Sequence, residues 1–287
     1  LTGTTTATPN VTCDNSALGT TSCDYNVASS GFIVTDGDNQ NASSCATNTF
    51  TIQAVRSPAS PGDGACIPEY ANTNKSLTFS YNYVTPNPTN IVNPATATIE
   101  GQSHTATTTG SAVSVPFDSD GKAQIDVSYA EAGLISVTVN DNNGVLSSTS
   151  ASSGFVPATL SLDWADGTAN NTAGKAEQVS IVGACADGTV TQNYIPSGKF
   201  EISATRVAPT DAEIQSEDAS ITPNDLETLL IANKTTVNPN GPAVAVDVST
   251  GNTQVIQVEY SEAASLQLSI TDTNYLSQRI NSSNALN

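Results

Sequence analysis

The sequence contains no methionine, and it has a single histidine and a single tryptophan among its 287 residues. Basic side chains are also scarce: eight Lys and Arg stand against 27 Asp and Glu, and the formal net charge is −19. A charge of this sign repels phosphate backbones, which argues against nucleic-acid binding. No apolar run approaches the roughly 20 residues that cross a bilayer as a helix, so we expect no membrane span in this fragment.

The scarcity of histidine and aromatic residues also narrows the enzyme classes. A Ser-His-Asp triad would have to use His104, which has no nucleophile-elbow motif nearby. Aromatic residues make up only 5% of the chain, whereas sugar clefts use aromatic platforms. Core packing is the favoured interpretation of Trp164, and ligand contact beside Asp163 and Asp166 is the alternative. We therefore expect a protein that is not an enzyme.

Cysteines are present but unevenly placed. Cys13, Cys23, Cys45 and Cys66 lie near the start, and Cys185 stands alone. Clustered cysteines in an acidic, lysine-poor chain favour an oxidising, extracytoplasmic setting. Four cysteines allow three pairings, and we favour Cys13–Cys23 and Cys45–Cys66 because each closes a short loop. A metal site is the weaker alternative, since no CxxC is present. We expect Cys185 to be a buried thiol that packs as a small hydrophobe.

Strand patterns dominate the chain. Short stretches alternate apolar with polar residues and are rich in β-branched and aromatic side chains, as in Ser76–Val84 and Leu134–Val139. Clusters of Pro, Gly, Asn and Asp separate them, which is turn chemistry. One segment differs: Thr222-Pro-Asn-Asp225 carries N-terminal helix signals, and Leu226, Leu229 and Leu230 follow at helical spacing. This pattern predicts one short helix that ends near Lys234.

The sequence repeats itself without gaps. Gly110–Asn143 and Gly241–Asn274 share eleven residues, among them Tyr129/Tyr260 within a Tyr-x-Glu-Ala motif. A second echo, Ser-Ser-Gly-Phe at 29–32 and 152–155, lies upstream. Repeats longer than 100 residues indicate whole domains in tandem. We therefore predict an all-β fold of two tandem immunoglobulin-like β-sandwiches with the short helix in the second. The predicted boundaries are a leading segment at 1–28, the first module at 29–151 and the second at 152–287.

The repeated tyrosines predict a structural role. Each ends a strand just before a tight turn, where a tyrosine can bury its ring and bond its hydroxyl to nearby backbone. We therefore interpret Tyr129 and Tyr260 as structural corners of the sandwiches.

Calcium is the most credible ligand. Hard oxygen donors gather in turns, and extracellular modules bind Ca²⁺ through such oxygens. We rank Asp36, Asp38 and Asn39 first, followed by Asp118 and Asp120. A plain β-turn is the alternative interpretation of each cluster.

Three stretches carry a family resemblance: Phe50–Arg56 followed by Gly64–Pro68 and Phe79–Pro86; Val115–Ala123; and Tyr129–Val139 followed by Gly154–Pro157. In order and spacing they resemble the C-terminal region of MshQ-type proteins, which occur with the mannose-sensitive haemagglutinin type IV pilus of Gram-negative bacteria. The resemblance is best over residues 30–160. It implies a location and a context rather than a reaction, because that region is a domain of unknown function.

These observations together predict an extracellular or cell-surface structural protein. The expected role is a pilus-associated or filament-forming subunit or stalk, whose partners are copies of itself or other pilus and cell-surface proteins. A carbohydrate-binding adhesin module, assisted by calcium, is the alternative, with a glycan as partner. The chain begins at Leu1 without a signal peptide, and we interpret it as a piece of a longer protein that continues beyond Asn287.

Overall fold

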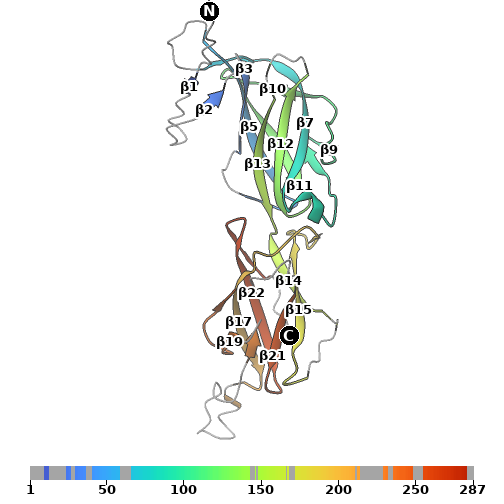
Figure 1. The fold of residues 1–287 in the computed structure, drawn as a ribbon, viewed down its shortest axis with the longest axis vertical. Helices are drawn as coiled ribbons and strands as arrows, with labels where there is room; N and C mark the ends of the chain where they lie inside the picture. The colour runs from blue at the N-terminus through green and yellow to red at the C-terminus, as the bar shows by residue number, and fades with distance from the viewer. Residues whose placement is uncertain are drawn as a thin grey trace, which may run out of the picture.

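The computed structural model describes residues 10–12, 24–26, 30–36, 41–58, 66–142, 146, 148–165, 167, 172–210, 212–213, 229–231, 235–247 and 255–282. The described chain is all-β and forms two sandwiches stacked end to end along the longest axis (Figure 1). A two-stranded ribbon of β1 (Asn10–Thr12) and β2 (Asp24–Asn26) precedes them. Among the described residues no helix is long and apolar enough to cross a membrane.

The first sandwich packs a five-stranded sheet against a six-stranded one. In spatial order the first sheet contains β10 (Val113–Pro116), β7 (Asn74–Thr85), β12 (Gly133–Asp141), β13 (Thr149–Val156) and β4 (Ala42–Ser43). The second contains β3 (Ser30–Asp36), β5 (Thr47–Arg56), β11 (Lys122–Tyr129), β8 (Ala97–Ile99) and β9 (Gln102–His104), with β6 (Ile67–Pro68) beside β5. A single turn of 3-10 helix, η1 (Pro88–Asn90), follows β7.

The second sandwich repeats this arrangement. One sheet contains β14 (Thr159–Trp164), β15 (Glu177–Ala184), β21 (Val255–Tyr260), β18 (Leu229–Ile231) and β19 (Thr235–Val237), with β16 (Val190–Thr191) beside β15. The other contains β20 (Val244–Asp247), β17 (Lys199–Ala208), β22 (Ser265–Tyr275) and β23 (Gln278–Asn281). Counterpart strands therefore occupy the same places in both sandwiches, although a common origin by duplication stays a prediction.

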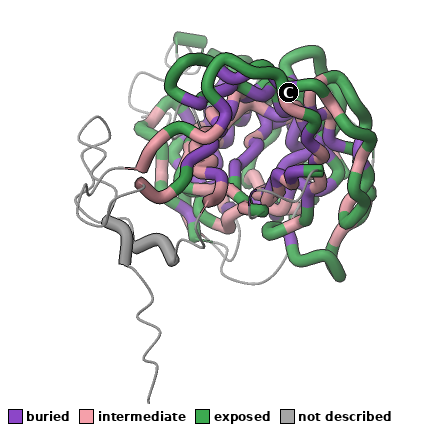
Figure 2. Tube along the Cα trace, turned by 90° about the horizontal axis from the view of Figure 1, so that it is seen from above, coloured by how far each residue is buried: buried purple, intermediate pink, exposed green. Residues whose placement is uncertain are grey.

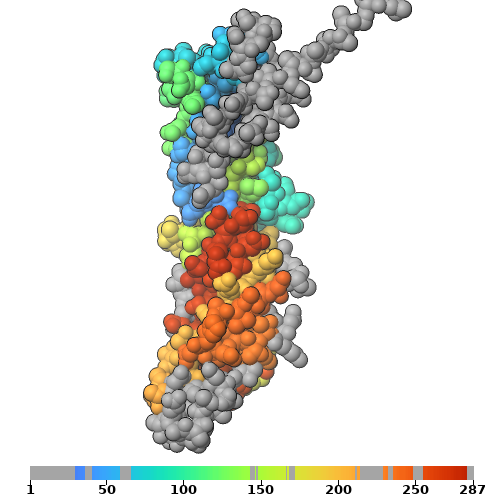
Figure 3. All heavy atoms as spheres, turned by 90° about the vertical axis from the view of Figure 1, so that its left-hand side faces the viewer, coloured from blue at the N-terminus to red at the C-terminus, as the bar shows by residue number. Residues whose placement is uncertain are grey.

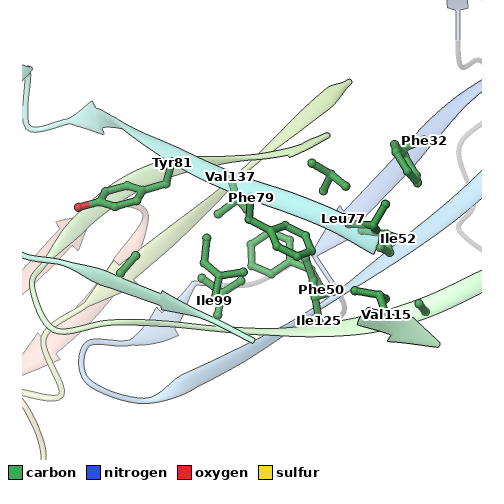
Figure 4. Packing of buried hydrophobic residues seen from close by; sticks show 14 of the residues in the cluster. Phe32, Phe50, Ile52, Leu77, Phe79, Tyr81, Ile99, Val115, Ile125 and Val137 are labelled. Atoms are coloured by element: carbon green, nitrogen blue, oxygen red, sulfur yellow. The ribbon is translucent and has the colours of Figure 1, made fainter. Parts of the chain in front are cut away.

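Alternating side chains build each core. In β12 every second residue from Gly133 to Asp141 is buried, as the period-2 geometry of a strand requires. Figure 4 shows the aromatic and aliphatic side chains of β5, β7 and β11 meeting between the two sheets of the first sandwich. A separate cluster fills the second sandwich. Seen along the long axis, buried residues lie inside and exposed residues outside (Figure 2).

The predicted helix is wrong where the structure describes it. Leu229 and Leu230 belong to β18, in which Leu229 and Ile231 are fully buried and pair with Tyr260 and Val258 of β21. Burial against a neighbouring strand thus overrides the helical spacing of the leucines. Residues 221–228 lie outside the described residues.

Strand β13 of the first sandwich runs past residue 151, where the first module was predicted to end. Phe32 lies on β3, whereas Phe155 lies on β13 in the opposite sheet, so the Ser-Ser-Gly-Phe echo does not mark equivalent places. Phe155 is buried in the first core, and β13 continues across residue 152 to Val156. The second sandwich begins with β14 at Thr159.

Candidate functional site: the joint between the sandwiches

The two sandwiches meet at the turn that joins β11 to β12. This turn carries the Glu131 and Ala132 of the repeated motif. Both are buried, with 2% and 0% of their surface exposed, although they sit at the end of the first sandwich. Ala132 packs into the core of the second sandwich rather than the first. The turn is therefore part of the interface between the two sandwiches and not only a corner of its own domain.

Glu131 holds a hydrogen-bond network that crosses the joint. Its Oε2 accepts from the backbone N–H of Asn193 in the second sandwich at 2.9 Å. Its Oε1 accepts from Nδ2 of Asn93 at 2.8 Å. The Asn193 side chain reaches back, accepting from the N–H groups of Val92 and Asn93 and donating to the Asn93 carbonyl. A buried carboxylate is tolerated only when donors satisfy it in this way.

A second buried carboxylate positions Asn193. The next residue, Tyr194, donates its hydroxyl to Oδ2 of Asp272 at 2.8 Å, and the Ser197 N–H donates to the same oxygen at 2.9 Å. Asp272 is fully buried. Burial, reinforced by the Asp272 charge and the hydrogen bond, raises the pKa of Tyr194 far above its ordinary value, so its hydroxyl stays a donor. This bond fixes the loop after β16 against β22.

A disulfide closes the joint covalently. Cys45, which lies beside the turn of Glu131 and Ala132, is bonded to Cys185 in the β15–β16 hairpin, with their Cα atoms 5.8 Å apart. The predicted Cys45–Cys66 pairing is therefore wrong, and so is the prediction that Cys185 is an unbonded thiol. Loop length misled the prediction, because the bond joins two domains rather than one loop. Cys13 and Cys23 lie outside the described residues, and Cys66 is partly exposed.

Short connections restrict the joint further. Only Pro157 and Ala158 separate β13 from β14, and the proline ring fixes one backbone dihedral of this linker. Asn41 of the first sandwich donates its Nδ2 to the carbonyl of Leu276 in the second at 2.6 Å. In Figure 3 the red segment that holds Leu276 lies directly beneath the first sandwich.

The predicted calcium residues are only partly described. The side chains of Asp36, Asp38 and Asn39 lie outside the described residues. Asp118 and Asp120 are exposed in the β10–β11 turn, where Asp118 Oδ1 accepts from the N–H groups of Asp120 and Lys122, both at 2.8 Å. Within the described ranges no group of three or more His, Cys, Asp or Glu side chains could hold a metal ion. Calcium binding therefore stays a prediction.

The predicted corner tyrosines differ from each other. Tyr129 is buried against Tyr81, Tyr83 and Phe155, as a corner residue should be. Its hydroxyl, however, makes no hydrogen bond to backbone within the described part of the chain, so the expected bond is not made. Tyr260 is only partly buried.

Trp164 lies at the end of β14 and packs at the margin of the second core. The ring is partly buried there, and its neighbour Asp163 is exposed, whereas Asp166 lies outside the described residues. This placement agrees with core packing better than with a freely presented sugar platform.

The contacts of the joint have a mechanical consequence. A covalent bond, a buried charge network and a two-residue linker together resist bending and pulling apart. Sequence reasoning singled out the Tyr-x-Glu-Ala repeat but assigned its importance to the tyrosine. Two features of the sequence indicated the joint: the apolar Ala132 next to Glu131, and Cys185, the fifth cysteine, which stands apart from the other four.

Residues 10–150, just under half of the chain, match the family model described as "Domain of unknown function (DUF6701), first Ig-like domain". This match supports the immunoglobulin-like assignment of the first sandwich and leaves the MshQ-type assignment unconfirmed. A search of curated protein sequences finds no match to the chain.

Three solved adhesin structures resemble the chain weakly. InvE of Yersinia pseudotuberculosis is 14% identical with a TM-score of 0.34, covering 91% of this chain and 59% of its own. FdeC of Escherichia coli is 15% identical with a TM-score of 0.38, covering 88% and 64%. Invasin, a bacterial integrin-binding protein, is 12% identical with a TM-score of 0.34, covering 88% and 39%. At these values the likeness does not extend to function.

Proposed function

We propose that the chain is a non-enzymatic part of a bacterial cell-surface stalk, which holds an adhesive element at a distance from the cell. The observation that carries this proposal is the joint. Domains within one chain move relative to each other unless their interface is tightly made. Here Glu131, Asn193 and the Cys45–Cys185 bond tie the two sandwiches together.

The chemistry of the chain suits an extracellular position. A disulfide between domains persists only where the compartment is oxidising. The net charge of −19 keeps an extended rod soluble and discourages association with other acidic surfaces. The MshQ-type resemblance supports placing the stalk with a type IV pilus system of a Gram-negative bacterium. A glycan-binding role is less favoured, because Trp164 packs at the margin of the second core.

The stalk function is tested by loosening the joint on living cells. Cells that display this chain within its native surface protein would carry Glu131→Ala together with Cys45→Ser and Cys185→Ser. An exposed carboxylate change, Asp120→Ala, serves as the control. We expect the triple variant to be displayed in equal amounts, measured by antibody labelling, but to adhere less well under flow. Equal adhesion at equal display would contradict the stalk function.

Imaging separates a stalk from a filament subunit. Electron microscopy of the native protein released from the cell surface should show single rods whose length exceeds two sandwiches. Ordered filaments with a two-sandwich repeat would instead make the chain a polymerising subunit.

A further inference from the structure

The far end of the second sandwich preserves the docking turn of the joint but leaves it uncovered. In the first sandwich, the N–H of Cys45 donates to the carbonyl of Tyr129 at 2.8 Å. In the second, the N–H of Gly174 donates to the carbonyl of Tyr260 at 2.7 Å. Cys45 and Gly174 both have left-handed backbone, with φ of 65° and 73°. The two turns therefore share their backbone geometry, and Gly174 stands where the joint has its cysteine.

Burial distinguishes the two turns. Glu131 and Ala132 are covered by the second sandwich. Their counterparts, Glu262 and Ala263, are exposed at the opposite end of the chain, in the β21–β22 turn at the bottom of Figure 1. A plain solvent turn has no need of the same Tyr-x-Glu-Ala sequence, since its glutamate would have nothing to bind.

We propose that the turn Ser261–Ala263 is a docking surface for a following β-sandwich, which presents an amide side chain and a free backbone N–H at the place of Asn193. The partner binds as the second sandwich binds the first, with Glu262 accepting a hydrogen bond from the partner's backbone N–H, as Glu131 accepts from Asn193, and Ala263 entering the partner's core. The disulfide is absent from this contact because Gly174 replaces the cysteine. This inference deepens the stalk function and rests on it.

Charge argues against a second copy of this chain as the occupant. Tyr70 donates to Asp141 at 2.7 Å just as Tyr194 donates to Asp272, so the loop after β6 is the counterpart of the loop after β16. The place of Asn193 is then taken by Glu69. Its N–H is already bonded to the Ala54 carbonyl, and its carboxylate pairs with Arg56. Two glutamates would face each other in a head-to-tail dimer, and like charges across an interface disfavour it.

The test extends the chain with a sandwich that has the required surface. A second copy of residues 156–287 is fused after Asn287, and Gly174→Cys restores the cysteine of the joint. In a glutathione buffer, the new thiol and Cys185 of the fused copy are oxidised to a disulfide while glutathione disulfide is reduced to two glutathiones. Peptide mapping without reduction detects the bond, and we expect it in most molecules. If both thiols instead remain free and can still be titrated, the proposal is overturned.

Controls assign the bond to the turn. Adding Glu262→Ala should slow its formation about tenfold, whereas Asp247→Ala, the same charge change at an exposed position of β20, should leave the rate unchanged. An equal effect of both changes would contradict a specific role of Glu262. The unfused native chain should remain monomeric in sedimentation over a wide concentration range, and head-to-tail assembly would overturn the choice of partner.

The same fusion distinguishes a failure of the docking surface from a failure of the stalk function. Residual dipolar couplings report whether neighbouring sandwiches share one orientation. A fixed first joint beside a mobile third sandwich would refute only the docking surface. Mobility at both joints would refute the stalk function as well.

Discussion

At the scale of single residues, buried tyrosine–aspartate bonds hold the loops that shape each sandwich end. Tyr194→Phe removes one donor from the fully buried Asp272 and should destabilise the second sandwich by about 1–3 kcal/mol. Tyr275→Phe is the matched control: its ring lies 5.0 Å from that of Tyr194, and its hydroxyl has no partner among the described residues. Urea unfolding should show a loss for the first variant and none for the second. Equal losses would contradict the assignment.

His104, the only histidine, should make the first sandwich sensitive to mild acid. It is 2% exposed, and among the described residues no hydrogen bond of good geometry reaches either ring nitrogen. Burial lowers its pKa below the ordinary value, so the folded state holds it neutral. Stability is then fully present above the unfolded pKa of about 6.5 and falls as the pH drops below it. Hydrogen-exchange protection factors of β8 and β9, corrected for the intrinsic exchange rate at each pH, should fall between pH 7 and 5.5. His104→Leu should abolish that change, and persistence of the change would refute the explanation.

At the scale of elements, the strands were predictable and their partners were not. The alternation of Leu77, Phe79 and Tyr81 specifies one face of β7, and all three side chains are fully buried. Alternation is a local property, so a single sequence reveals it. The gapless repeat also located the turns after Tyr129 and Tyr260 correctly.

The errors arose where distant segments decide the structure. β18 is a strand because β21 lies beside it, and nothing local to Leu229 shows this. Cys45 pairs with Cys185 across 140 residues, a pairing that loop-length arguments reject. Glu131 looked like part of a turn because the side chains that cover it come from the next domain. The candidate site was therefore missed while most of the fold was found.

Gly133, which directly follows the Tyr-x-Glu-Ala motif of the first sandwich, should be essential to strand β12. Gly133 begins β12 with φ of 149°, and a Cβ there would lie 2.3 Å from the Thr85 carbonyl oxygen. Gly133→Ala should therefore cost about 1–3 kcal/mol in the first sandwich. Gly31→Ala is the control, since a Cβ on β3 would meet nothing within 4 Å. Thermal unfolding checks both variants, and an unchanged melting temperature for Gly133→Ala would show that the strand adapts.

At the scale of the whole molecule, the two cores are separate, and we expect the contacts of the joint to make the chain behave as one rod. The hydrophobic clusters share no buried residue, so each sandwich has its own source of stability. Rigidity comes instead from polar and covalent contacts at the joint. The network around Glu131 and the short Pro157–Ala158 linker should hold the orientation even when Cys45→Ser and Cys185→Ser remove the disulfide.

The most direct test of the joint is to measure residual dipolar couplings for the oxidised chain in a dilute aligning medium. Amides of both sandwiches should fit a single alignment tensor with the orientation seen in Figure 1. The Cys45→Ser, Cys185→Ser variant should give the same single tensor. When Glu131→Ala is added, the two sandwiches should require two different tensors. Two tensors of different magnitude in the oxidised native chain would contradict a rigid joint, and with it the stalk function.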